Sequence, residues 1–94
     1  MKVNLYATFR LIAETRSLEL DVPAGTTVRE VIRCVVERLP VLRSHWLDED
    51  GHLHAHVHIL YQGDDVMTLS RGLDTPLPAD AVLEIFPPVA GGAG

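Results

Sequence analysis

The sequence is poor in cysteine and has no long apolar run. Cys34 is the single cysteine among 94 residues, so the chain can form neither an internal disulfide nor a cysteine-rich metal site. No apolar stretch approaches the length of a membrane-spanning helix, and the beginning, MKVNLYATFR, lacks the continuous apolar run of a signal peptide. We therefore expect a soluble domain of the reducing cytoplasm that has no membrane partner.

Basic residues and aromatic residues are also scarce. The chain has 8 basic against 13 acidic residues and a net charge of −5, and such a surface repels phosphate backbones, so nucleic-acid binding is not expected. Aromatic residues make up 5% of the chain, so the core should consist mainly of Val, Leu and Ile. A length of 94 residues indicates one domain with little room for a deep enclosed active site.

Alternation of apolar and polar residues predicts strands near both ends of the chain. Lys2 to Phe9 and Arg16 to Val22 alternate with a period of two, and the segment Arg10 to Thr15 is short enough to join them as a hairpin. Ala81 to Phe86 reads as the last strand, because Pro87-Pro88 ends its ladder pairing.

A helix is predicted between these strands, and it is the clearest element of the sequence. Thr27 and Glu30 have the spacing of a capping box. Apolar residues follow at helical spacing and form one stripe: Val28, Val31, Ile32, Val35, Val36 and Leu39. Pro40 should stop this helix.

The second half of the chain predicts shorter elements. These are a turn or helix over Val41 to Leu47, a turn at Asp48 to Gly51, a strand over His54 to Tyr61, a tight turn at Gln62 to Asp65, a strand over Val66 to Leu69, and a loop over Gly72 to Asp80. The order of elements predicts an α+β domain over residues 1–88, with a mixed sheet of four to five strands packed on one main helix. Residues 89–94 are expected to form a flexible tail.

A run of alternating histidines, HLHAHVH, places His52, His54, His56 and His58 at every second position. On a strand they would share one face, about 7 Å apart, and two such imidazoles could bind zinc or copper. The residues between them read as the core side, and no Asp, Glu or Cys within the run completes a ligand set. We therefore predict a solvent-facing strand surface and no metal site. The alternatives are adventitious metal binding or a face whose charge responds near neutral pH.

No other motif predicts catalysis. Cys34 should lie exposed, opposite the apolar stripe of the helix and beside Arg33 and Arg38, with no histidine in register to activate it. The acidic runs Asp48 to Asp50 and Asp64-Asp65 look like solvated turns. There is no phosphate-binding glycine loop, catalytic triad order or paired-carboxylate motif. The chain is therefore predicted to be neither an enzyme nor a cofactor-binding protein.

The end of the chain, FPPVAGGAG, has a distinctive composition. Pro87-Pro88 extends the backbone stiffly beyond the last strand, and Val89 to Gly92 adds a reach of roughly 13 Å. Two glycines let the backbone pass where any side chain would collide. The tail alone leaves two readings open: it presents a carboxylate to another protein's active site, or it is a disordered end.

Three segments together resemble the MoaD/ThiS-type sulfur carriers. They are GTTVREVIRCVVERLP, VHILYQGDDV and GLDTPLPADAVLEIFPPVAGG. The resemblance runs from Lys2 to Gly92, and the long loop around Trp46 resembles the branch that includes the carrier CysO. It implies a ubiquitin-like β-grasp fold.

The resemblance also implies a mechanism centred on Gly92. An E1-like adenylyltransferase and sulfurtransferase would use ATP to adenylate its carboxylate, and a sulfur donor would convert the adenylate into a thiocarboxylate. That sulfur would then pass to a biosynthetic enzyme. Val89, Ala90 and Gly91 would be recognised in the partner's cleft. Docking is expected through an apolar sheet face near the last strand, with Leu60, Phe86 and Pro87 as candidates.

This chain departs from the family pattern in two places. His58 and Gln62 stand in the third strand and its turn, where relatives often carry Asn, so partner contacts there can differ. Ala93 and Gly94 follow the diglycine and block the Gly92 carboxylate in an amide bond. In relatives with such an extension a JAMM-type metalloprotease removes it, and we expect the same here. The alternative is a ubiquitin-like modifier joined to lysines through Gly92. The sequence does not identify the sulfur acceptor, whether molybdopterin, cysteine or a siderophore-like metabolite.

Overall fold

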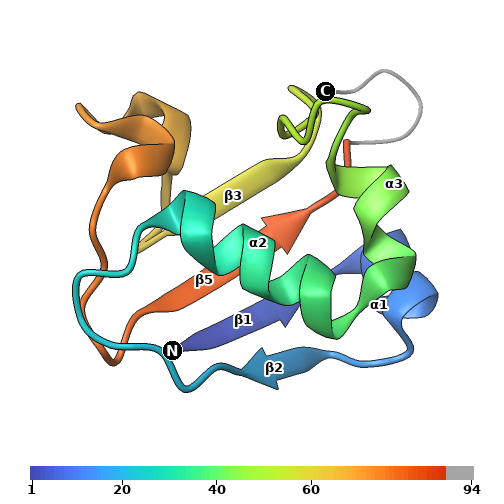
Figure 1. Ribbon diagram of the computed structural model, residues 1–94, viewed down its shortest axis with the longest axis horizontal. Helices are drawn as coiled ribbons and strands as arrows, with labels where there is room; N and C mark the ends of the chain where they lie inside the picture. Colours follow the sequence, from blue (N-terminus) through green and yellow to red (C-terminus); the bar gives the residue numbers. More distant parts are fainter. Residues whose placement is uncertain (89–94) are drawn as a thin grey trace.

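Five strands form one mixed sheet, and the helix α2 (Val28–Arg38) lies across one face of it (Figure 1). The computed structural model describes residues 1–88. The strands are β1 (Lys2–Leu5), β2 (Ser17–Glu19), β3 (His58–Tyr61), β4 (Asp64–Asp65) and β5 (Val82–Phe86). Their order across the sheet is β2-β1-β5-β3-β4. The predicted α+β class and the mixed sheet on one main helix are confirmed.

The strand β5 lies at the centre of the sheet. It pairs in parallel with β1 and antiparallel with β3, so that Ile85 stands opposite Leu5 on one side and Ile59 on the other. These three side chains are buried under α2. The last strand of the described chain is therefore held on both sides, and its end has a fixed position.

The capping box predicted for α2 is present. The Glu30 backbone N–H donates to Thr27 Oγ1 at 3.2 Å, and the Thr27 N–H donates to Glu30 Oε1 at 3.0 Å. Five members of the predicted stripe are buried, namely Val28, Val31, Ile32, Val35 and Val36. Leu39 caps the helix end, and the chain then turns at Pro40 into the 3-10 turn η1 (Pro40–Leu42).

One end of the core is closed by η1 and the short helix α3 (Arg43–Trp46), as the sequence predicts. Leu42 and Trp46 are fully buried, and Leu47 is half-buried. The Trp46 ring meets Phe9 edge to face, with 5.6 Å between the ring centroids. Among residues 1–88, the indole nitrogen of Trp46 is the one buried side-chain nitrogen or oxygen without a hydrogen-bond partner.

The predicted pairing of the first two strands as an antiparallel hairpin is confirmed, whereas the predicted short connection over Arg10 to Thr15 is wrong. The first strand ends at Leu5 instead of Phe9, and a helix, α1 (Ala7–Ala13), follows. Phe9, Ile12 and Ala13 have helical spacing, and Phe9 is buried while the other two pack on the core edge. The alternation of Ala7, Thr8 and Phe9 was too short to distinguish the two periods.

Two further predicted strands are shorter or absent. Val66 begins the 3-10 turn η2 (Val66–Thr68), because Asp65 Oδ1 accepts a hydrogen bond from the Met67 N–H at 2.9 Å and draws the chain out of the sheet. The second strand covers Ser17–Glu19 instead of Arg16 to Val22. The predicted loop over 72–80 contains one further 3-10 turn, η3 (Gly72–Asp74). No helix in residues 1–88 is long and apolar enough to cross a membrane.

Candidate functional site

The candidate site begins where β5 ends, at Phe86 and Pro87. The predicted tail residues Val89, Ala90, Gly91, Gly92, Ala93 and Gly94 lie outside the described residues. The structure does describe what carries the tail, which is the end of the central strand and the sheet face beside it.

The face of the sheet turned away from α2 is called the open face here. Side chains alternate between the two faces along a strand, so the open face carries the residues that alternate with the buried ones. It comprises Lys2, Asn4 and Tyr6 of the β1 segment, His58 and Leu60 of β3, and Val82, Glu84 and Phe86 of β5. All eight are half-buried or exposed. This face is therefore accessible to a partner.

Four residues at the end of β5 interlock, and we call them the tail root: Tyr6, Arg10, Glu84 and Phe86. The rings of Tyr6 and Phe86 stack in parallel, with centroids 4.3 Å apart and planes 9° apart. The Tyr6 hydroxyl donates to Glu84 Oε2 at 2.6 Å. The Arg10 guanidinium lies 5.6 Å from the Tyr6 ring centroid, and Arg10 Nε donates to the Leu5 carbonyl at 3.2 Å. These contacts fix the direction in which the chain leaves the sheet.

The tail root also sets the protonation of Tyr6. The hydrogen bond that the phenol donates to Glu84 raises the pKa of Tyr6, because it stabilises the neutral hydroxyl. Partial burial and the negative charge of Glu84 raise this pKa further, while Arg10 opposes them. Tyr6 thus remains a hydrogen-bond donor throughout the neutral range.

The structure places the three predicted docking residues on one side of the sheet. Leu60 and Phe86 lie on neighbouring strands of the open face, with His58 directly opposite Phe86 and Glu84 opposite Leu60. Pro87 follows Phe86 and is half-buried. Val82 adds a further apolar side chain that is 42% exposed. The open face therefore carries three apolar side chains, Leu60, Val82 and Phe86, around the carboxylate of Glu84 in the central strand.

Sequence reasoning did not assign a role to Tyr6, Glu84 or Arg10. Alternation did place Tyr6 on the polar side of the first strand, which was the available signal. What it could not supply was the parallel pairing of β1 with β5, which brings Tyr6 beside Phe86 although they are 80 positions apart. Arg10 reaches the site because the chain folds into α1.

The predicted common face of the histidine run is wrong. Only His58 belongs to β3, and the chain before it forms turns: Leu53 bridges to Leu47, and the Val57 N–H donates to the His54 carbonyl at 3.1 Å. His54 and His56 stack on each other with ring centroids 5.0 Å apart. The run leaves the sheet because Leu53 packs against the core from the turn and not from a strand.

Cys34 is half-buried against the core, so the prediction that it is exposed is wrong. The end of α2 approaches the segment after β2, and Cys34 shares a shallow groove with Leu20 and Val22 from that segment. No histidine lines this groove. Within this groove no imidazole is therefore available to activate the thiol.

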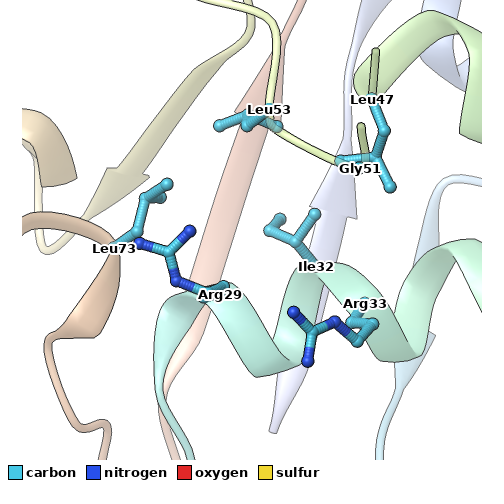
Figure 2. A pocket seen from close by; sticks show the side chains of 7 residues that line it. All are labelled: Arg29, Ile32, Arg33, Leu47, Gly51, Leu53 and Leu73. Carbon is cyan, nitrogen blue, oxygen red and sulfur yellow. The ribbon is translucent and has the colours of Figure 1, made fainter. Parts of the chain in front are cut away.

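The hollow seen in Figure 2 lies between α2, the turn 47–53 and η3. Ile32, Leu47, Leu53 and Leu73 form its apolar wall, and the guanidinium groups of Arg29 and Arg33 stand at its rim. Its volume of about 30 Å³ is far below the roughly 300–1,000 Å³ of small-molecule sites. It does not resemble a substrate pocket.

The sequence profile of the ThiS family matches residues 3–92. The chain belongs to the ThiS family. It is 34% identical over 92 residues to small archaeal modifier protein 3 of Haloferax volcanii, covering 98% of both chains. The crystal structure of SAMP1 from the same organism superposes with a TM-score of 0.85 at 30% identity, covering 97% of each chain. The Amycolatopsis orientalis BexX/CysO complex contains a chain that matches with a TM-score of 0.75 at 27% identity, covering 97% of this chain and 98% of that one.

These relatives establish the fold and the class of this ThiS-family protein. The sheet and helix form a ubiquitin-like β-grasp, as the resemblance implied. The relatives are small carrier or modifier proteins, so the prediction that this chain is not an enzyme is confirmed. In such a protein the tail root and the open face are the parts to which a chemical role can be assigned.

Proposed function

We propose that this ThiS-family protein is a sulfur carrier in precursor form, whose working terminus is Gly92. The observation that carries the proposal is that the family match ends at Gly92, six residues beyond a central strand whose end is clamped by the tail root. Ala93 and Gly94 follow Gly92 and must first be removed, for which we propose a JAMM-type metalloprotease. The single cysteine suits the reducing cytoplasm, which we propose as the compartment.

Two successive displacements would activate the freed carboxylate. A Gly92 carboxylate oxygen attacks the α-phosphorus of ATP, pyrophosphate leaves, and an acyl adenylate forms on an E1-like partner. Hydrosulfide, as the sulfur donor, then attacks the carbonyl carbon, AMP leaves with the electron pair of the C–O bond, and loss of the sulfur-bound proton gives the thiocarboxylate. The carrier itself needs no acid or base for these steps, in keeping with a chain that is not an enzyme.

The open face is the proposed docking surface for the E1-like partner and for the enzyme that accepts the sulfur. Its apolar side chains, Leu60, Val82 and Phe86, surround Glu84, and Phe86 ends the strand from which the chain continues toward the tail. A partner that covers Leu60 and Phe86 lies next to the point where the chain leaves the sheet. The existence of a complex between CysO and BexX supports an association of this kind.

A second candidate function is conjugation to other proteins. It is favoured by the 30% and 34% identity to proteins named small archaeal modifiers. In this case a lysine amine of the target attacks the activated Gly92 carbonyl and forms an isopeptide bond. Activation and docking are the same as for sulfur transfer, and the two functions differ only in the nucleophile.

Intact mass after incubation tests the proposal. Full-length protein and a chain ending at Gly92 are each incubated with the cognate protease, the E1-like enzyme, ATP and a sulfur donor. We expect the full-length chain to lose one Ala and one Gly and then to exchange one oxygen for sulfur. The chain ending at Gly92 should gain the sulfur without the protease, and omission of ATP should prevent the exchange in both.

The results separate the alternatives. Covalent ladders on lysine-containing proteins without oxygen-to-sulfur exchange would favour the modifier function. If both chains stay unchanged although the E1-like enzyme activates a known carrier in the same assay, the proposal is wrong. If only the full-length chain stays unchanged, the carrier function stands and the assigned protease is incorrect.

A further inference from the structure

The turn between Leu47 and Leu53 collects side chains that can bind a metal ion, and no step of the proposed function uses them. The turn is closed by the bridge between Leu47 and Leu53 and by the Asp48 N–H, which donates to the His52 carbonyl at 2.8 Å. Figure 2 shows Leu47, Gly51 and Leu53 at the wall of the hollow above α2. The turn is therefore anchored to the body at both ends, while its polar side chains face solvent.

Asp48, Asp50 and His52 each present one ligand atom, and the three atoms lie within 4.8 Å of one another. A tetrahedral zinc ion with bonds of about 2.0–2.2 Å holds its ligand atoms about 3.4 Å apart, so rotations of these exposed side chains would bring the three atoms to bonding distance. His52 Nδ1 lies 3.9 Å from Asp48 Oδ2. The sequence prediction of no metal site considered only the histidine run, whereas the structure adds two carboxylates that precede it.

The two oxygens of Asp48 have different roles. Oδ1 accepts hydrogen bonds from the backbone N–H groups of Asp50 and His52, both at 2.9 Å, so the carboxylate is already oriented. Oδ2 is the atom that faces the imidazole. Asp48 Oδ2 therefore remains free of these backbone hydrogen bonds and can serve as the ligand atom.

The imidazole groups determine which class of metal ion the site prefers. Carboxylates alone suit Ca²⁺ or Mg²⁺, whereas an imidazole nitrogen favours Zn²⁺, Ni²⁺, Cu²⁺ or Co²⁺. Independently of the turn geometry, all five histidines of the chain fall within residues 45–58, and short histidine-rich tracts are typical metal binders.

We propose that Asp48, Asp50 and His52 bind one divalent transition-metal ion of the Zn²⁺ class. Two carboxylates and one neutral imidazole match the charge of the ion and leave coordination positions open for water or for a ligand from a partner protein. The three ligand residues belong neither to the open face nor to the tail root.

Calorimetric titration of the full-length protein with Zn²⁺ at neutral pH tests the proposal. We expect one ion per chain, and His52→Ala should weaken binding by roughly 10- to 100-fold or more, the range found when metal sites lose even an outer partner. Asp48→Asn should weaken it similarly. This variant keeps a carbonyl oxygen at Oδ1 for the two N–H donors, and unchanged amide signals of Asp50 and His52 in the NMR spectrum would show that the turn is intact.

His58→Ala is the matched control, because it also removes one of the five imidazoles but does so on the open face. The affinity of this variant for Zn²⁺ should equal that of the parent protein. Ca²⁺ should bind to neither of the two proteins. The proposal is overturned if His52→Ala and His58→Ala weaken binding equally, since the affinity would then belong to the histidine run as a whole. It is also overturned if Asp48→Asn binds as tightly as the parent with its turn intact.

Discussion

At the scale of single residues, the Tyr6 hydroxyl holds the tail root together. Tyr6→Phe keeps the ring that stacks on Phe86 but removes the 2.6 Å hydrogen bond to Glu84. We expect the free energy of unfolding to fall by about 1 kcal/mol, the usual net value of one hydrogen bond at a site that is not fully buried. Urea unfolding checks this. Tyr61→Phe is the control, because the described residues give the Tyr61 hydroxyl no hydrogen-bond partner; a loss as large there would contradict the assignment.

A second residue-scale prediction concerns the turn between β3 and β4. Gln62 and Gly63 have φ angles of +54° and +83°, the two left-handed residues of a type I′ turn. Glutamine is strained there, whereas asparagine tolerates this conformation. Gln62→Asn should therefore raise the free energy of unfolding by about 0.5 kcal/mol, a fraction of the 1–2 kcal/mol left-handed penalty. Thermal unfolding measures it, and a lower melting temperature would count against the turn assignment.

At the scale of elements, the capping box at the N-terminal end of α2 makes a contribution to stability that depends on pH. Hydrogen bonds from the Thr27 backbone and hydroxyl lower the pKa of Glu30 below its ordinary value of 4.5. A lowered pKa in the folded state adds stability above the unfolded pKa, and this stability is lost as the pH falls through the folded value. Glu30→Gln should therefore be less stable than the parent at pH 7, with a difference that shrinks below about pH 4. Unfolding curves across this range test it; a constant difference would contradict it.

The same elements show how far sequence reasoning reaches. The helix α2 was predicted with its cap and its buried stripe because eleven residues repeat one period three times over. The helix α1 was not predicted because its seven residues are too few to distinguish a strand from a helix. The burial of Phe9 against Trp46 favours the helix. The predicted start of the third strand was too early in the sequence. The chain before this strand forms a turn closed by the pairing of Leu47 with Leu53, and an alternating pattern does not reveal such a turn.

Some residues of the candidate site were named from the sequence, and others were missed. Leu60, Phe86 and Pro87 were named as docking candidates because the resemblance implies an apolar sheet face near the last strand, and their docking role stays a prediction. Tyr6, Arg10 and Glu84 were missed, since their proximity arises from parallel pairing between the first and last strands. The predictions for the tail, from Val89 to Gly94, rest on the sequence alone, because these residues lie outside the part of the chain that the structure describes.

At the scale of the whole molecule, the two sides of the sheet differ in burial. The α2 side holds the core, and the exposed open face is the surface that we propose for docking. Leu60→Lys should slow modification of Gly92 by the E1-like enzyme roughly 30-fold, as expected for losing a hot-spot contact of about 2 kcal/mol. Its stability should change by less than about 0.5 kcal/mol, because the introduced ammonium group would lie between the carboxylates of Asp65 and Glu84.

Val41→Lys is the control for this docking prediction. Val41 is an apolar side chain, 53% exposed, in the turn that follows α2. The same charge introduced there should leave the modification rate unchanged when followed by intact mass. Equal slowing by the two variants would mean that added positive charge, and not loss of the apolar contact, disturbs the partner.

The central position of β5 has a consequence for how the protein is made. Residues 82–86 are the last strand of the described chain to be synthesised, yet they join β1 on one side and β3 on the other. While the ribosome still holds this segment, the sheet is split into two halves that cannot bury their shared core. Folding is thereby postponed until the strand that carries the tail has emerged. A translation product that stops short of β5 lacks both the tail and the central strand of the sheet, so under the proposed function it would not compete with the complete chain for partner enzymes.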